Sequence, residues 1–67
     1  MIEITIGGEA KPFDAPLPLT ELIERLGFSG RRIAVERNGE IVPRSRFDST
    51  LIDQGDRLEI VTAVGGG

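Results

Sequence analysis

The sequence lacks the residue types on which most small catalytic and metal sites depend. Its 67 residues contain no cysteine and no histidine. Disulfides, thiolate nucleophiles, histidine bases and zinc sites built on these side chains are therefore excluded. No apolar run approaches the roughly 20 residues that a membrane helix needs. Since an N-terminal secretion signal is also missing, we expect a cytoplasmic protein that binds neither a metal nor a membrane.

The chain also lacks the size for a deep active site. A domain of this length buries only about 60% of the surface that its unfolded chain exposes, so few residues remain to wall a cleft. Asp53 and Asp56 resemble an acid–base pair, but they flank a glycine-containing turn, where solvated aspartates are common. We therefore expect a protein that is not an enzyme itself.

Positive charge is scarce except in one segment. The net charge is −3, which disfavours nucleic-acid binding because phosphate neutralisation needs clustered Lys and Arg. Residues 31–46, however, hold five arginines against two glutamates. This segment is interpreted either as an ordinary solvated surface or as a basic patch for an acidic partner or a phosphate.

The hydrophobic periodicity predicts two strands and then one helix. Residues 2–6 alternate between apolar and polar, as in a half-buried strand, and residues 11–14 are expected to return beside them as an edge strand because of Pro12. Apolar residues recur at helical spacing from Leu19 to Leu26, and Gly27 is typical of the position just past a helix end.

The second half predicts three more strands. Residues 32–37 and 40–42 flank Asn38-Gly39, a pair typical of a tight hairpin. Residues 57–63 form the last strand, while Phe47 and Leu51 are expected to anchor the intervening loop or helical turn in the core. The order β-β-α-β-β-β indicates an α+β roll, in which the helix crosses one face of a mixed sheet of four to five strands.

The chain ends Gly65-Gly66-Gly67, directly after this last strand and without an acidic or serine-rich linker. We expect residues 1–64 to form the domain and 65–67 a flexible tail. Because glycine has no Cβ, such a backbone can pass through a narrow channel and bring its carboxylate to another protein's catalytic groups. The tail therefore predicts a protein-sized substrate whose chemistry is supplied by a partner.

Two segments resemble a known family. Residues 35–47, with the run Asn-Gly-Glu-Ile-Val-Pro-Arg, resemble the hairpin and following turn of the ThiS family, the small sulfur carriers of thiamine biosynthesis. Residues 51–64, followed by the glycines, are similar to that family's last turn and strand. The resemblance covers nearly the whole chain and implies a ubiquitin-like β-grasp fold.

The resemblance also implies a chemistry and a set of partners. An E1-like adenylyltransferase of the ThiF type would use ATP and magnesium to adenylate the Gly67 carboxylate, while Gly65 and Gly66 thread its active site. A sulfur-donating desulfurase relay would convert Gly67 to a thiocarboxylate. A thiazole synthase of the ThiG type would take the sulfur for the thiazole ring of thiamine. The chain itself would bind no cofactor.

The acceptor and the partner surface stay open at this point. The chain could instead carry sulfur for molybdopterin or another pathway, or be an inert ubiquitin-like interaction module. For partner binding, the candidates are the outward Val61, with Ala63 and Val64 leading into the tail, and the basic Arg37 and Arg44. Val61 could equally pack beneath a loop.

Overall fold

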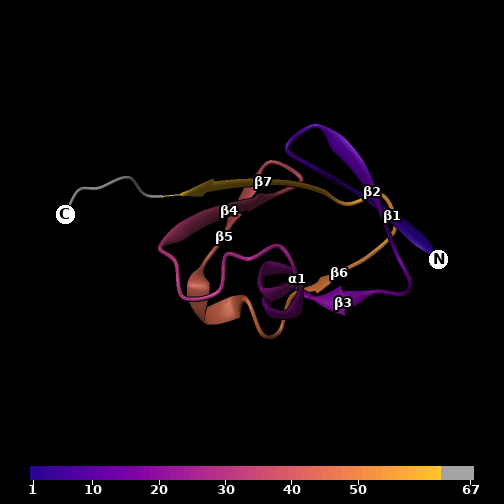
Figure 1. The fold of residues 1–67 in the computed structure, drawn as a ribbon. Helices are drawn as coiled ribbons and strands as arrows, with labels where there is room; N and C mark the ends of the chain where they lie inside the picture. Colours follow the sequence, from indigo (N-terminus) through magenta and orange to yellow (C-terminus); the bar gives the residue numbers. More distant parts are fainter. Residues whose placement is uncertain (63–67) are drawn as a thin grey trace.

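Five strands form the main sheet of the computed structural model, which describes residues 1–62 (Figure 1). The strands lie in the order β2-β1-β7-β4-β5, with β1 and β7 parallel and the other neighbours antiparallel. Their bounds are Ile2–Ile6 for β1, Glu9–Phe13 for β2, Ile33–Arg37 for β4, Glu40–Val42 for β5 and Arg57–Thr62 for β7. The predicted mixed sheet is confirmed.

Within residues 1–62, a single α-helix, α1 (Leu19–Arg25), covers one face of this sheet (Figure 1). Its apolar stripe buries Leu19, Leu22 and Ile23, which join the inward side chains of three strands in the core. Those side chains include Ile4, Val35 and Leu58. No helix within residues 1–62 is both long and apolar enough to cross a membrane.

The end of α1 is fixed by Gly27, which has a φ of +85°. The Gly27 N–H donates to the Glu24 carbonyl at 3.1 Å, and the Phe28 N–H donates to the Ile23 carbonyl at 3.0 Å. These two bonds form a Schellman motif, in which glycine supplies the left-handed residue. The helix therefore ends where the sequence predicted, and the half-buried Phe28 is turned back beside Ile23.

Residues with positive φ also form the turns of two hairpins. Asn38 and Gly39 have φ of 52° and 87°, as a type I′ turn requires, which confirms the predicted hairpin between β4 and β5. Gly7 and Gly8 also have positive φ and connect β1 to β2. Strand β2 begins at Glu9, earlier than expected, and its edge position accommodates Pro12.

A second, two-stranded sheet was not predicted from the sequence. Strand β3 (Leu17–Pro18) pairs with β6 (Leu51–Ile52), and between β5 and β6 lies a 3₁₀ turn, Arg44–Arg46. Ile52 is fully buried opposite Leu17, so strand alternation leaves Leu51 54% exposed. The expectation that Leu51 anchors the core is therefore wrong, whereas Phe47 does pack against the core.

Candidate functional site

Strand β7 leads into the predicted tail. It lies at the centre of the sheet, and Leu58 is held in the core with only 1% of its surface exposed. Strand β1 is in register with β7 only at Arg57 and Leu58, whereas pairing with β4 continues to Thr62, opposite Ile33. The strand is thus anchored at its start and supported on the β4 side up to the last described residue.

Five predicted site residues lie outside the described residues. These are Ala63, Val64, Gly65, Gly66 and Gly67. Their expected roles as leading segment, threading segment and acyl carrier stay predictions. The described residues, 1–62, form the folded part of the chain that precedes this segment, and this part is called here the platform.

The face of the sheet opposite α1 is called here the open face, and it carries an apolar group beside the end of β7. Val61 is 62% exposed, so the expectation that it points outward is confirmed, and it does not pack under a loop. It pairs across the ladder with the exposed Ala34. Ile41, on β5, is 69% exposed. Exposed apolar side chains that lie close together can mark a docking surface for another protein.

Next to this apolar group lie two carboxylates. Glu59 and Glu36 are exposed and directly opposite each other on β7 and β4, and Ile41 faces Glu36 from β5. Like charges in directly opposed positions destabilise an antiparallel pair. The open face therefore combines apolar side chains with an unfavourable concentration of negative charge, an arrangement suited to a partner surface with positive charge.

Arg37 is occupied by an intramolecular contact. Its Nε donates to Asp56 Oδ2 at 3.1 Å, and a terminal guanidinium nitrogen lies 3.1 Å from the same oxygen. The Asn38 side-chain amide donates to Asp56 Oδ1 at 3.1 Å, and the Asp53 N–H donates to Asp56 Oδ2 at 2.9 Å. Asp56 thus joins the β4–β5 hairpin to the turn before β7.

Asp56 differs from the solvated turn aspartate that the sequence indicated, because only 8% of its surface is exposed. Burial opposes its ionisation, but the hydrogen bonds from Asp53, Asn38 and Arg37 and the charge of Arg37 outweigh burial and lower the pKa of the Asp56 carboxyl. Its role is structural: it fixes the start of β7. Within residues 1–62, no cluster of acidic side chains is arranged to hold a metal ion.

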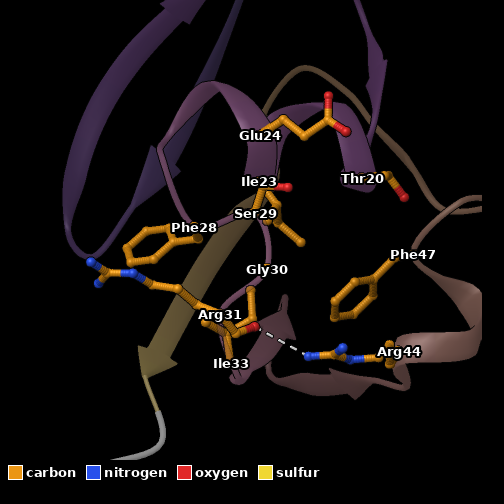
Figure 2. A pocket seen from close by; sticks show the side chains of 10 residues that line it. All are labelled: Thr20, Ile23, Glu24, Phe28, Ser29, Gly30, Arg31, Ile33, Arg44 and Phe47. Atoms are coloured by element: carbon orange, nitrogen blue, oxygen red, sulfur yellow. Dashed lines mark hydrogen bonds between the residues drawn. The ribbon is translucent and has the colours of Figure 1, made fainter.

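Arg44 lies on the other side of the sheet, at a pocket beneath α1 (Figure 2). Its guanidinium donates to the Arg31 carbonyl at 3.2 Å, which joins the 3₁₀ turn to the loop before β4. The structure therefore does not bring together the two predicted basic residues, since Arg37 serves Asp56 and Arg44 borders the pocket.

Comparison with known proteins identifies the family. The ThiS family model matches residues 2–67. The crystal structure of the thiamine biosynthesis protein ThiS from Geobacter metallireducens superposes with a TM-score of 0.86 at 33% identity, and the match covers 98% of this chain and 100% of that one. The chain belongs to the ThiS family. The sulfur-carrier family of thiamine biosynthesis and its β-grasp fold, both expected from the sequence, are thereby confirmed.

Two further relatives of this ThiS-family chain differ in length. An uncharacterized protein of Porphyra purpurea is 44% identical, over 98% of this chain and 93% of its own length. A thiazole synthase of Paramagnetospirillum magneticum is 42% identical over 98% of this chain, which spans only 20% of that enzyme's length. A ThiS-like segment therefore occurs within a longer polypeptide named for thiazole synthesis.

Two features of the ThiS-family platform were missed by sequence reasoning. The buried Asp56 could have been suspected from Asn38-Gly39 and Arg37 only if the pairing of β4 with β7 had been known. The pocket was signalled by Gly27, which predicts that the chain reverses and returns Phe28 to Ile23, but its other walls come from β4 and the segment near Phe47.

Proposed function

We propose that this chain carries sulfur on the carboxylate of Gly67 for the thiazole ring of thiamine. A carboxylate oxygen attacks the α-phosphate of ATP on an E1-like enzyme with magnesium, and pyrophosphate leaves. A sulfur nucleophile from a desulfurase relay then displaces AMP from the acyl-adenylate. When that nucleophile is the terminal sulfur of a persulfide, the product is an acyl disulfide. A second thiol then attacks the sulfur of the donor cysteine, forms a disulfide with it and releases the thiocarboxylate, which a thiazole synthase consumes, returning the carboxylate.

The observation that carries this proposal is the extent of the family match, which runs to residue 67 and so includes all three terminal glycines. The absence of cysteine and histidine agrees with it, because the activating chemistry then has to reside in partners. Glycine suits the acceptor position, since a residue without Cβ neither crowds the α-phosphate nor has a stereocentre to lose on activation.

The platform contributes recognition. Val61, Ala34 and Ile41 offer apolar surface on the open face, and Glu36 with Glu59 supplies negative charge. We propose that the activating enzyme docks here, so that the segment after Thr62 enters its nucleotide site.

Intact mass tests the chemistry directly. The purified chain is incubated with ATP, magnesium, the ThiF-type enzyme of the same genome and a sulfur donor. We expect a mass increase equal to the difference between sulfur and oxygen. A chain shortened by Gly66 and Gly67 is the matched control and should not change. An unchanged mass for the full chain under conditions where the enzyme consumes ATP with a known carrier would refute the proposal.

The acceptor is tested separately. The thiazole synthase named among the relatives favours thiazole over molybdopterin, because a similar segment lies in one polypeptide with that activity's name. Purified thiocarboxylate should therefore lose its sulfur when mixed with thiazole synthase and its substrates. Transfer to the large subunit of molybdopterin synthase instead would reassign the pathway, and an inert interaction module predicts neither transfer.

A further inference from the structure

A pocket on the α1 side of the sheet has an apolar floor that the fold builds from distant segments (Figure 2). The Schellman turn brings Phe28 beside Ile23, β4 contributes Ile33 at its first position, and Phe47 follows the 3₁₀ turn. The cavity has a volume of about 140 Å³. This pocket is separate from the open face, which lies on the other side of the sheet.

The size of the pocket limits its occupant. Cofactor and small-molecule sites are typically about 300–1,000 Å³, so this cavity is too small for most of them. A cavity of about 150 Å³ lined by apolar side chains is large enough for a benzene molecule. The pocket therefore fits one large apolar side chain of a partner protein.

Two arginines line the pocket, and they are named here the arginine rim: Arg31 and Arg44. Arg32 follows Arg31 in the chain and is also exposed, whereas Arg46 lies two residues after Arg44 and borders a different hollow, with Ile41 and Val42. Within residues 1–62, no carboxylate forms an ion pair with either rim arginine, whereas Arg25 and Arg37 each have one. Glu24 is the single acidic residue that lines the pocket.

This concentration of positive charge is unusual for the molecule, because the whole chain has a net charge of −3. Both rim arginines are exposed, and the one side-chain hydrogen bond described for the rim is that of Arg44 to the Arg31 carbonyl. Most guanidinium donors at the rim are thus directed to solvent. Such a rim is complementary to carboxylates placed on either side of an apolar residue.

The pocket also lies beside the end of β7. Ile33, on its floor, is paired with Thr62, the last described residue before the segment that carries the proposed acyl group. An enzyme that receives this segment has to approach the rim. The pocket and the open face could therefore be contacted in the same complex, from opposite sides of the strand.

We propose that the pocket is a docking site for an acidic segment of the thiazole synthase, with one large apolar side chain seated between Phe28 and Phe47 and flanking carboxylates on the arginine rim. The identity of the partner rests on the function proposed above, and on the relative in which a ThiS-like segment and the name thiazole synthase share one polypeptide. Docking at this site would hold the platform while the sulfur is transferred.

The test compares two single charge reversals in binding to the purified thiazole synthase of the same genome, measured by biolayer interferometry. Arg31→Glu alters the rim at a side chain that makes no hydrogen bond to residues 1–62, so folding should be kept. Lys11→Glu makes the same change in charge on the edge strand β2. We expect Arg31→Glu to weaken binding about tenfold and Lys11→Glu to change it less than about twofold.

A second measurement locates the contact. In a methyl-labelled chain, adding the thiazole synthase should shift the Ile23 and Ile33 signals more than that of Ile41 on the open face. Shifts at Ile41 alone, equal effects of the two charge reversals, or no binding of the unaltered chain would each overturn the proposal. A rim-dependent loss of binding to the activating enzyme alone, or of self-association, would also overturn it.

The same comparison is made in chains that end at Thr62. If the rim binds an acidic partner, Arg31→Glu should weaken binding by a similar factor in this background. If Arg31→Glu no longer weakened binding in chains that end at Thr62, the pocket would be the site of the segment after Thr62 and not of the partner. Because these readouts are binding measurements, they remain informative even if no thiocarboxylate forms, which separates failure of this site from failure of the proposed chemistry.

Discussion

Asp56 and Arg37 are joined by two contacts of 3.1 Å to one carboxylate oxygen. Asp56 ends the turn before β7, and Arg37 ends β4, so their pairing secures the strand that leads to the predicted reactive end. Because Asn38 and the Asp53 N–H also bind the same carboxylate, three groups from two segments depend on one side chain.

Asp56→Ala should therefore lower the free energy of unfolding by about 1–3 kcal/mol, since it leaves partly buried donors without their acceptor. Urea unfolding followed by circular dichroism measures the change. Asp14→Ala removes a carboxylate that is exposed in the loop before β3 and serves as the control. Equal stabilities of the two variants would contradict the structural role of Asp56.

The free energy of unfolding should also decrease at acid pH because the Asp56 carboxylate becomes protonated. The pKa of Asp56 is lower in the folded chain than its unfolded value of about 3.9, so in this range the unfolded state binds more protons. The contribution is complete above the unfolded pKa and is lost as pH falls through the folded pKa. We expect the stability difference between the unaltered chain and Asp56→Asn to be constant from pH 7 to about pH 5 and to shrink below about pH 4. A constant difference down to pH 2 would contradict this linkage.

Much of the fold was predictable because its signals are local. The alternation of Ile2, Ile4 and Ile6, the helical spacing of Leu19 and Leu22 and the Asn38-Gly39 turn each act over a few residues. The pairing of β3 with β6 joins residues more than thirty positions apart, and two-residue strands carry no periodicity. The exposure of Leu51 instead of Ile52 follows from that pairing and could not be read without it.

The candidate site likewise combines features that a single strand predicts with features that depend on the strand order. The outward position of Val61 follows from alternation along one strand, and it was predicted correctly. The network of Asp56, the opposition of Glu36 and Glu59 and the pocket floor each need the strand order. Arg37 and Arg44 look alike as solvated charges in the sequence, but tertiary contacts give one a carboxylate partner and the other a carbonyl beside a cavity.

Because Glu36 and Glu59 are paired on the open face, reversing one charge should increase stability and weaken partner binding. Glu59→Lys places opposite charges across the ladder from Glu36, and it should raise the free energy of unfolding by about 0.2–1 kcal/mol. The same change should weaken binding to the ThiF-type enzyme if that enzyme presents positive charge there. Glu3→Lys, on β1 opposite Pro12, is the control for net charge. Unchanged affinity for Glu59→Lys would remove the acidic pair from the docking surface, and unchanged stability would show that the pair is fully screened.

Substitutions of Val61 and Leu58, both on β7, test partner binding and folding separately. Val61→Ser alters a side chain that is 62% exposed, so stability should stay within about 0.5 kcal/mol of the unaltered chain. Binding to the activating enzyme should nevertheless weaken, because apolar contact area beside the strand end is lost. Leu58→Ala, at a position only 1% exposed, should cost about 2–5 kcal/mol in unfolding free energy. Thermal unfolding and titration of the folded variants with the enzyme distinguish the two effects, and a Val61→Ser chain that binds normally would place the docking surface elsewhere.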